Sequence, residues 1–545
     1  MPKPNPNGPK LPIKQLAILA VARFAEPLAY TSIFPYLPEM IKDFGIHQDD
    51  VGKWAGIISA AFSFSQSATG VPWGYVSDRL GRKPILITGL CINMVCFVAW
   101  GMATSLTMAI IVRCIQGASA GNVGIIRTMV AEMVPQKELQ PIAFSLMPII
   151  WSLGSVVGPA FGGFFARPAE QFPDIFGNIQ FFKTFPYALP NLLAMVMFTI
   201  SVTSATLFLK ETLAEKRGAK DWGLLVGQKL TNAFSRKRTS NRRRSFVDGE
   251  ATAPLVPTRP LPRGAKGGMP SNADVFNRQT VINLVSYSIL AFHSVAYDQN
   301  VNVLMDYEVK DPSEFKLPFY FDTGFGMDSG QIGTVFAIYG IACSLIQFIL
   351  YPPLVARFGV LRCFRICCMI LPFVYMITPY TALFPTERGR VAAIIVVMVF
   401  KAFGIIVAFP STTILLTNSC SSLKVLGTLN GYATMFSGIA RGLGPATTGL
   451  IFTWGAKRGY VVLPYYYLAL FAATGAFVSF MIEDENNLAT ASDESDSDAV
   501  DDSATLLQDE SAVASESEDE DDSTKPLLNR KQPNTQYQAI SGTSK

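Results

Sequence analysis

Long apolar runs recur along the chain and alternate with short polar stretches. A helix of about 20 residues crosses the hydrocarbon core of a bilayer, so each run predicts one membrane-spanning helix. The runs lie at 14–37, 53–77, 84–103, 106–132, 141–165, 186–209, 279–303, 329–352, 363–383, 389–418, 427–452 and 461–482. The pattern predicts an all-α polytopic membrane protein with about 12 transmembrane helices in two six-helix bundles.

Polar segments divide the 545-residue chain into five parts. The expected organisation is a cytoplasmic N-terminus at 1–13, a first bundle at 14–210, a cytoplasmic linker at 211–277, a second bundle at 278–483 and a cytoplasmic tail at 484–545. The linker carries two basic triplets, at 236–238 and 242–244, and the tail alternates acids with serines. Neither segment can bury an apolar core, so the basic linker and the acidic tail are both predicted to be largely disordered.

Basic residues predict the orientation in the membrane. They gather before the first run, between the second and third runs and between the eighth and ninth, as Lys3, Lys10, Lys14, Arg79, Arg82, Lys83, Arg357, Arg362 and Arg365. An even number of spans separates these clusters, which places them all on one side. By the positive-inside rule that side is the cytoplasm, and both termini lie there.

Composition narrows the class of function. Half of the residues are hydrophobic and 16% are charged, which is more apolar than soluble globular proteins usually are. The eight cysteines fall mostly in or beside apolar runs without metal-ligand spacing, and the sequence has no phosphate-binding Gly-x-x-x-x-Gly-Lys-Ser/Thr loop. We therefore expect that the protein is not an enzyme and that it has neither a metal site nor a cofactor. The expected energy source is an ion gradient, namely the proton gradient. The expected partners are a small-molecule substrate and the lipid bilayer. No nucleic-acid partner is expected, and the protein is expected to be a monomer.

A short charged turn joins the second and third runs and reads Gly74-Tyr75-Val76-Ser77-Asp78-Arg79-Leu80-Gly81-Arg82-Lys83-Pro84. It is too short for a domain, so it predicts a tight hairpin with Asp78 at one helix end and Arg82 at the start of the next. A carboxylate there can hold a guanidinium and face a helix N-terminus, which stabilises one conformation and must break in another. The predicted conformational latch comprises Gly74, Asp78, Arg79, Gly81, Arg82, Lys83 and Glu132.

This hairpin sequence resembles the signature loop of the major facilitator superfamily of secondary transporters. The resemblance implies two related bundles around a midplane cavity, with alternating access to the two sides of the membrane. It also implies that the hairpin locks the outward-facing state. The second half carries only a degenerate copy at 354–362 without the acid, so the latch is expected to be asymmetric.

Arg113 and Gln116 lie in the fourth run, in a stretch similar to a second motif of the superfamily, where an arginine is associated with proton transfer. An arginine inside a membrane is costly and normally faces a cavity or a partner. A role in coupling or in the substrate cavity is the favoured hypothesis, and a structural hydrogen-bonding role is the alternative.

The fifth run carries a ladder of small residues. Its members are Gly154, Gly158, Pro159, Gly162 and Gly163. The ladder is similar to a motif typical of exporters and antiporters, which favours antiport. Small residues four apart also let helix backbones touch, so close packing explains the glycines equally well.

Arg23 and Glu26 lie three residues apart on one face of the first predicted helix. They could neutralise each other. Alternatively, Glu26 is a protonatable carboxyl that faces the cavity. The sequence leaves both readings open, and Glu26 is the first choice for the coupling carboxylate.

Three further titratable residues, His293, Lys401 and Arg441, fall inside predicted spans of the second half. Asp298 follows His293 by five residues, too far round a helix for an ideal pair, and is expected near the membrane surface. Lys401 and Arg441 give the predicted cavity a net positive charge, which suits an anionic or zwitterionic substrate. A proton-relay role is considered for His293.

The tail contains a short pattern in which Asp502, Leu506 and Leu507 resemble an acidic dileucine sorting signal. In the linker, Ser245 directly follows three arginines, which makes it a candidate phosphorylation site. These features make a sorting adaptor and kinases candidate partners. They favour the vacuolar membrane, with the plasma membrane as the alternative.

Residues 23–27 with 32–37, and 122–124 followed by 127–132, look like a fungal group related to drug:proton antiporters and to plant zinc-induced-facilitator-like carriers. The chain lacks the paired-cysteine motif of the plant group, which argues against a metal-related substrate. The predicted function is proton-coupled antiport of small organic solutes, for efflux or vacuolar sequestration. The alternatives are a proton-coupled importer of an anionic or zwitterionic metabolite and a transporter-like nutrient sensor.

Overall fold

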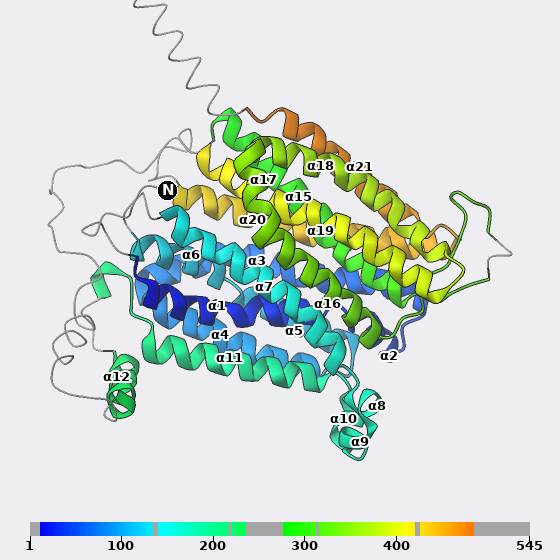
Figure 1. The fold of residues 1–545 in the computed structure, drawn as a ribbon. Coiled ribbons are helices and arrows are strands. Elements are labelled where there is room, and N and C mark those ends of the chain that lie inside the picture. Colours follow the sequence, from blue (N-terminus) through cyan, green and yellow to red (C-terminus); the bar gives the residue numbers. More distant parts are fainter. Residues whose placement is uncertain are drawn as a thin grey trace, which may run out of the picture. The chain divides into compact units, whose positions relative to one another are not determined.

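The computed structural model describes residues 11–134, 140–216, 221–235, 276–311, 315–419 and 426–483, and within these ranges helices dominate (Figure 1). The long helices of the first half are α1 (Ile13–Ser32) with α2 (Leu37–Asp43), α3 (Val51–Leu80), α4 (Arg82–Gly101), α5 (Leu106–Ser119) with α6 (Asn122–Met133), α7 (Gln140–Phe165) and α11 (Ala188–Phe208). Three short helices, α8 (Pro168–Gln171), α9 (Pro173–Phe176) and α10 (Gln180–Thr184), connect α7 to α11.

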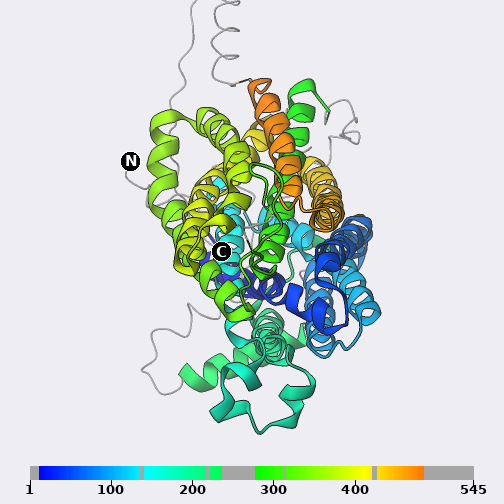
Figure 2. The same cartoon turned by 90° about the vertical axis from the view of Figure 1, so that its right-hand side faces the viewer.

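The second half repeats this arrangement. Its helices are α15 (Arg278–Asp306), α16 (Ser329–Leu345), which continues through a π-helical turn η4 (Ile346–Leu350) into α17 (Tyr351–Phe358), α18 (Val360–Ile377) with η5 (Thr378–Leu383), α19 (Glu387–Asn418), α20 (Leu426–Ala456) and α21 (Leu463–Phe480). In Figure 2, which views the helices nearly end-on, the blue helices of the first half and the yellow and orange helices of the second half form separate groups.

The prediction of a polytopic all-α membrane protein is confirmed. In the described part of the chain, eight helices are long and apolar enough to cross a membrane, or nine if α1 and α2, bent by 55°, form one span. The other predicted runs coincide with α3, α7 and α20, which lie alongside these helices (Figure 1). The bend between α1 and α2 contains Pro35, which has no backbone N–H to continue the helix.

The two halves meet along two helix pairs. Helix α3 packs against α20, and α7 packs against α16. Glycines allow this approach: a Cβ on Gly56 of α3 would lie 2.2 Å from the carbonyl oxygen of Pro445 in α20, and a Cβ on Gly163 of α7 would lie 2.4 Å from that of Ser329. The backbones therefore touch where the halves join.

The glycine ladder of α7 serves mostly packing within the first half. Cβ atoms on Gly154, Gly158 and Gly162 would all collide with α1, the last at 1.8 Å from the carbonyl oxygen of Ser32. Pro159 is buried in the same helix. Close helix packing accounts for these residues, and the exporter reading of the ladder stays a prediction.

The linker departs from the predicted disorder in its first part. Residues 214–216 form a 3₁₀ turn, η2 (Ala214–Lys216), and residues 222–235 form a helix, α12 (Trp222–Ser235). The basic triplets at 236–238 and 242–244 and the tail from 484 onward lie outside the described residues. The tail's sorting pattern at Asp502, Leu506 and Leu507 therefore stays a sequence prediction, as does Ser245.

Candidate functional site

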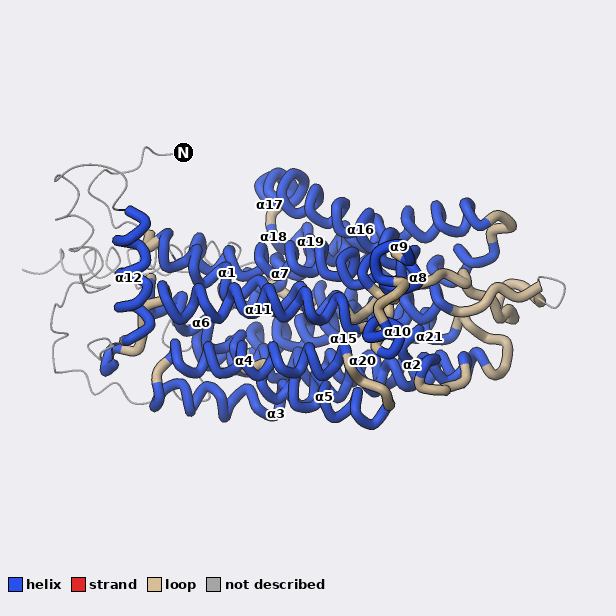
Figure 3. The backbone as a smooth tube through the Cα atoms, turned by 90° about the horizontal axis from the view of Figure 1, so that it is seen from below, coloured by secondary structure: helices blue, strands red, loops and turns tan. Residues whose placement is uncertain are grey.

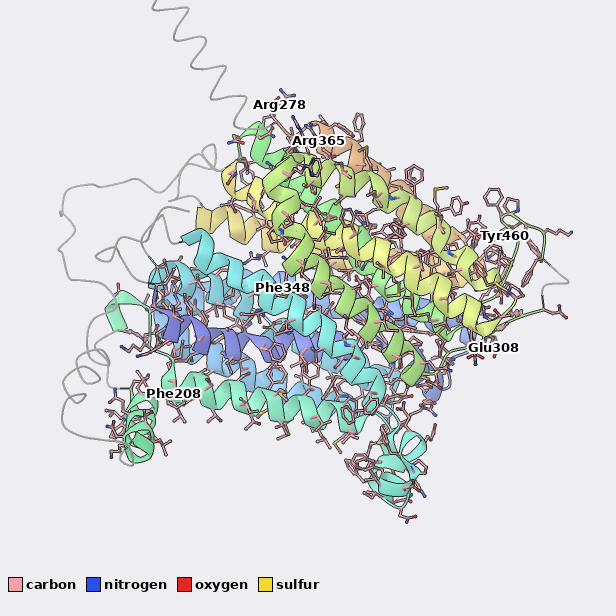
Figure 4. The ribbon with its side chains drawn as sticks, viewed as in Figure 1. Phe208, Arg278, Glu308, Phe348, Arg365 and Tyr460 are labelled. Carbon is pink, nitrogen blue, oxygen red and sulfur yellow. The ribbon has the colours of Figure 1, made fainter. Side chains whose placement is uncertain are left out.

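The charged turn forms the predicted tight hairpin. Helix α3 ends at Leu80 and α4 begins at Arg82, with Gly81 between them at a backbone φ of 110°. L-amino acids with a side chain rarely adopt that conformation, so glycine is required there. We call the end of the bundles that holds Gly81 the hairpin end and the opposite end, which holds Asp50, the far end. Figure 4 labels Phe208 and Arg278 near the hairpin end, and Glu308 and Tyr460 near the far end.

Arg82 is the centre of the latch. Its guanidinium lies 2.5 Å from the Asp78 carboxylate and 3.0 Å from that of Glu132 in α6, and it donates to the Ser77 hydroxyl at 2.6 Å. Glu132 also accepts from the Thr212 hydroxyl at 2.6 Å. The predicted grouping of Asp78, Arg82 and Glu132 is therefore present, and it joins three segments of the first half.

Glu211 is a member of this network that the sequence analysis missed. Its carboxylate accepts from the backbone N–H groups of Arg82 at 3.0 Å and Lys83 at 3.1 Å. These are free donors at the N-terminus of α4, where the helix dipole favours a negative charge. The available signal was an acid directly after the sixth apolar run, but nothing in the sequence shows which helix end it meets.

Two predicted latch residues stand apart from Arg82. The guanidinium of Arg79 lies 4.3 Å from the ring centre of Tyr75 and donates to the Tyr75 hydroxyl. A Cβ on Gly74 would meet no atom within 4 Å. The Gly74 backbone carbonyl accepts from the Ser77 hydroxyl at 2.7 Å, so Gly74 reaches the Arg82 network only through Ser77.

Arg113 is completely buried in α5 among aromatic rings. Its guanidinium lies 5.0 Å from the ring centre of Trp100, 5.3 Å from that of Phe62 and 5.7 Å from that of Tyr30. It donates to the Gln116 amide oxygen at 2.9 Å, whereas its Nε and Nη2 groups have no acceptor among the described residues. Buried donors without acceptors are costly, so they mark a place where a ligand's acceptor can bind.

Arg23 and Glu26 are both buried and form an ion pair within α1. The Arg23 guanidinium also lies 5.6 Å from the ring centre of Trp151 in α7. The pair joins two adjacent turns of one helix. The reading in which the two charges neutralise each other therefore describes this conformation.

His293 is buried in α15 and its Nδ1 lies 2.8 Å from the Tyr375 hydroxyl in α18. This contact links two helices of the second half. The expected separation of His293 from Asp298 is seen, because each has its own partner on another helix. The expected position of Asp298 near the membrane surface stays a prediction.

Asp298 instead pairs with Lys401. The Lys401 ammonium of α19, only 1% exposed in its side chain, lies 2.5 Å from the Asp298 carboxylate of α15, whose side chain is 30% exposed. Lys401 also donates to the Tyr339 hydroxyl of α16 at 2.9 Å. Three helices of the second half thus meet at one acid–base pair, which sequence reasoning missed because the two residues lie far apart in the chain.

Arg441 is the remaining predicted cavity base of the second half. Arg441 is half-buried in α20, where its Nε donates to the Ser437 carbonyl at 3.2 Å.

The halves are tied together at the far end. Lys457 lies 2.7 Å from Asp50, and Lys42 lies 2.7 Å from Asp306. Ser59 of α3 donates to Gln299 of α15 at 2.7 Å. These contacts close the far end in this conformation.

A second far-end cluster surrounds Arg167, which has a left-handed backbone with a φ of 46°. Its guanidinium lies 2.7 Å from the Asp43 carboxylate, which also accepts from the Tyr187 hydroxyl at 2.5 Å. Burial raises the pKa of Tyr187 well above its usual range despite the nearby Arg167. The hydroxyl therefore stays protonated as a donor, and the cluster fixes α2 to the start of α11.

Comparison with known proteins decides the family. The model of the Major Facilitator Superfamily matches residues 19–288. A multidrug transporter of this superfamily from Aspergillus fumigatus, mfsB, is 36% identical over 87% of this chain and 84% of its own length. The chain belongs to the Major Facilitator Superfamily.

A plant protein and a solved human structure are also similar to this chain. The protein ZINC INDUCED FACILITATOR-LIKE 1 from Arabidopsis thaliana is 26% identical over 86% of this chain and 91% of its own length. The crystal structure of the human organic anion transporter MFSD10 (TETRAN) superposes with a TM-score of 0.56 at 17% identity, covering 86% of this chain and all of that one. The predicted superfamily and the absence of enzymatic function are thereby confirmed.

Within the facilitator fold, the candidate site has three parts. The latch lies at the hairpin end of the first half, the buried Arg113 lies among rings of the first half, and the Asp298–Lys401 pair lies within the second half. Among the described residues, no group of three His, Cys, Asp or Glu side chains could hold a metal ion.

Proposed function

We propose that this transporter is a proton-coupled antiporter that moves drug-like organic solutes from the cytoplasm, driven by the proton gradient. The observation that carries the proposal is the 36% identity to a fungal multidrug transporter over most of both chains. The basic hairpin end faces the cytoplasm, in accordance with the positive-inside rule. Export out of the cell and sequestration into the vacuole follow the same mechanism.

Arg113 and its three rings are the proposed substrate site. Aromatic faces offer apolar stacking surface, and the two N–H groups without acceptors can bind a carbonyl, carboxylate or ether oxygen. An aromatic solute that carries a hydrogen-bond acceptor satisfies both demands. This supports an anionic, zwitterionic or neutral drug-like substrate.

Asp298 and Lys401 are the proposed coupling pair. Protonation of Asp298 removes the attraction that joins α15 to α19, and this changes the balance between two packings of the second half. Protonation of Glu26 breaks only a contact within α1. Asp298 is therefore preferred over Glu26, which remains the second candidate for the coupling carboxylate.

The conformation supports alternating access from the hairpin end. Ion pairs and touching backbones close the far end, whereas Cβ atoms on Gly70, Gly74 and Gly431 nearer the hairpin end would meet nothing within 4 Å. Away from the far end, the Arg127 guanidinium of α6 donates to the Thr434 hydroxyl of α20 at 3.2 Å, and Gly438 of α20 packs against Ser67 of α3. The proposed cycle opens the far end and closes the hairpin end, with the Arg82 latch stabilising the state seen here.

Flux in reconstituted vesicles tests the function. The full-length protein is placed in liposomes with an acidic lumen, and uptake of fluorescent aromatic acids and zwitterions such as fluorescein and norfloxacin is followed. Antiport predicts accumulation in the acidic lumen and its loss when a protonophore is added. Accumulation only in vesicles with an alkaline lumen would indicate a proton-coupled importer, and binding without any gradient-driven flux would indicate a sensor.

A further inference from the structure

An open groove of about 520 Å³ lies at the far end, where the two halves meet. Its lining comes from the start of α3 and from the end of α20 with the turn that follows, namely Asp50, Lys53, Leu450, Ile451, Thr453, Trp454, Lys457 and Arg458. Helices α3 and α20 pack side by side, and Figure 3 draws the loops of the far end in tan. Both halves therefore build the groove, which is large enough for a ligand.

The walls of the groove are closely joined. A Cβ on Gly449 of α20 would lie 2.3 Å from the carbonyl oxygen of Gly52 in α3. The backbone N–H of Lys53 donates to the Thr453 hydroxyl at 3.1 Å, which is a hydrogen bond between the halves. The backbones that carry the charged side chains of the groove are thus fixed relative to each other in this conformation.

The groove carries an excess of positive charge, because three of its residues are bases and one is an acid. The acid, Asp50, lies 2.7 Å from the ammonium of Lys457. In the part of the chain that the structure describes, neither Lys53 nor Arg458 forms an ion pair with a carboxylate. One base from each half is therefore available to an anion, and both side chains are of the types that bind phosphate.

Aromatic and apolar side chains border these two bases. The Arg458 guanidinium lies 4.4 Å from the ring centre of Trp454, and the Lys53 ammonium lies 5.1 Å from that of Trp54. Trp454 is 52% exposed, and Leu450, one turn earlier in α20, is 51% exposed. Tryptophan beside a base is typical of the level where the headgroups of a bilayer meet its hydrocarbon.

The position of the groove along the helices agrees with that level. Lys53 is the first residue of the predicted run 53–77, and Arg458 follows the predicted run 427–452. A ligand in the groove thus has its charged part at the membrane surface and an apolar part beside Leu450 and Trp454. A soluble anion would leave this apolar surface uncovered, whereas a phospholipid with an anionic headgroup matches both the charge and the apolar surface.

We propose that the groove binds an anionic phospholipid, with its headgroup phosphate on Lys53 of the first half and Arg458 of the second half and an acyl chain along Leu450 and Trp454. One phosphate then contacts both halves, so the bound lipid strengthens the closed far end. Opening of the far end separates α3 from α20 and breaks at least one of these contacts. The inference does not depend on the identity of the transported substrate.

Fluorescence of Trp454 tests the binding. The full-length protein is placed in phosphatidylcholine nanodiscs that contain a small fraction of brominated phosphatidylglycerol or, in parallel, of brominated phosphatidylcholine. The emission of Trp454 is the difference between each protein and its W454F derivative. We expect brominated phosphatidylglycerol to quench Trp454 severalfold more strongly than brominated phosphatidylcholine. Equal quenching by the two lipids would overturn the proposal, and so would loss of the preference on addition of inorganic phosphate, because the groove then takes a free anion.

Charge variants test whether the two bases hold the headgroup. We expect equal quenching by the two lipids in K53Q/R458Q, whereas K53R, which keeps the charge, should retain the preference for phosphatidylglycerol. The matched control K183Q/R388Q removes two exposed bases from α10 and α19, outside the groove, and should behave as the wild type. A preference that survives in K53Q/R458Q would refute the assignment of these bases.

Hydrogen exchange tests whether the lipid joins the halves. The amides of residues 50–56 and 449–456 are followed in nanodiscs of phosphatidylglycerol and of phosphatidylcholine. We expect phosphatidylglycerol to slow their exchange severalfold in the wild type and in K183Q/R388Q, and to have no such effect in K53Q/R458Q. Equal exchange of the wild type in the two lipids would refute the stabilisation of the far end.

Discussion

The ammonium of Lys401 in α19 lies 2.5 Å from the carboxylate of Asp298 in α15. The two residues are separated by 103 positions in the chain, and they come from the first and fourth long helices of the second half. A buried ion pair stabilises little when intact, since desolvation offsets the attraction, but breaking it is strongly unfavourable. Protonation of Asp298 would break the pair and leave the Lys401 charge without its partner, so a single proton could shift the balance between two conformations.

The latch predicts unequal effects of its two acids. The Asp78 side chain is 58% exposed, and that of Glu132 is 25% exposed. We expect D78N to lower the free energy of unfolding by about 0.2–1 kcal/mol, as for exposed ion pairs. E132Q should cost about 1–3 kcal/mol, since it weakens the pairing of a buried guanidinium. Thermal unfolding of the purified variants measures both, and a larger loss in D78N than in E132Q would contradict the network described.

Hairpin substitutions should also slow transport. If the Arg82 network stabilises one end state of the cycle, D78N lowers the turnover of drug in vesicles severalfold while the protein remains folded. Unchanged transport rates in D78N would count against a latch at this position.

The α1–α7 contact predicts a sharp effect of one methyl group. A Cβ at Gly162 would lie 1.8 Å from the Ser32 carbonyl oxygen, so G162A must push the helices apart. Overpacking of this kind costs about 1–3 kcal/mol, and the melting temperature should fall. The matched control is G124A in α6, where a Cβ meets nothing within 4 Å and no loss is expected. Equal stability of the two variants would show that α1 and α7 are less closely packed.

Arg113 should determine substrate affinity. R113K keeps the charge but lacks the planar fork that contacts the rings and offers the two N–H donors. We expect drug affinity to fall roughly tenfold, which is ~1.4 kcal/mol. The control R458K alters an exposed arginine that lies 4.4 Å from the ring centre of Trp454 at the far end, and affinity should not change. Binding to R113K as tight as to wild type would remove Arg113 from the substrate site.

The far-end ion pair between Asp50 and Lys457 predicts rescue by exchange of charge. D50K and K457D each place like charges at a contact of 2.7 Å, which destabilises the closed far end and slows transport. The double variant D50K/K457D restores attraction and should recover most of the rate. A double variant as slow as the single ones would mean that this pair does not close the far end.

Most of the fold and part of the candidate site could be predicted from the sequence. Apolar runs predict spans because lipid requires every backbone group to bond within a helix, and the hairpin places Asp78 beside Arg82 by chain proximity alone. The pairing of Asp298 with Lys401 depends on how helices distant in the chain pack, which no local pattern contains. Helix α12 was hidden because its short apolar face precedes basic triplets that suggested a disordered linker.

Proton release on substrate binding tests whether Asp298 carries the coupled proton. The purified protein is first loaded with protons in weakly buffered, acidic detergent solution with a pH indicator, and a transported drug is then added to the wild type and to D298N and E26Q. We expect the wild type to release protons and D298N, although it still binds drug, to release none. Release from D298N equal to that of the wild type would show that Asp298 does not carry the proton, and if E26Q alone loses release, Glu26 carries it instead.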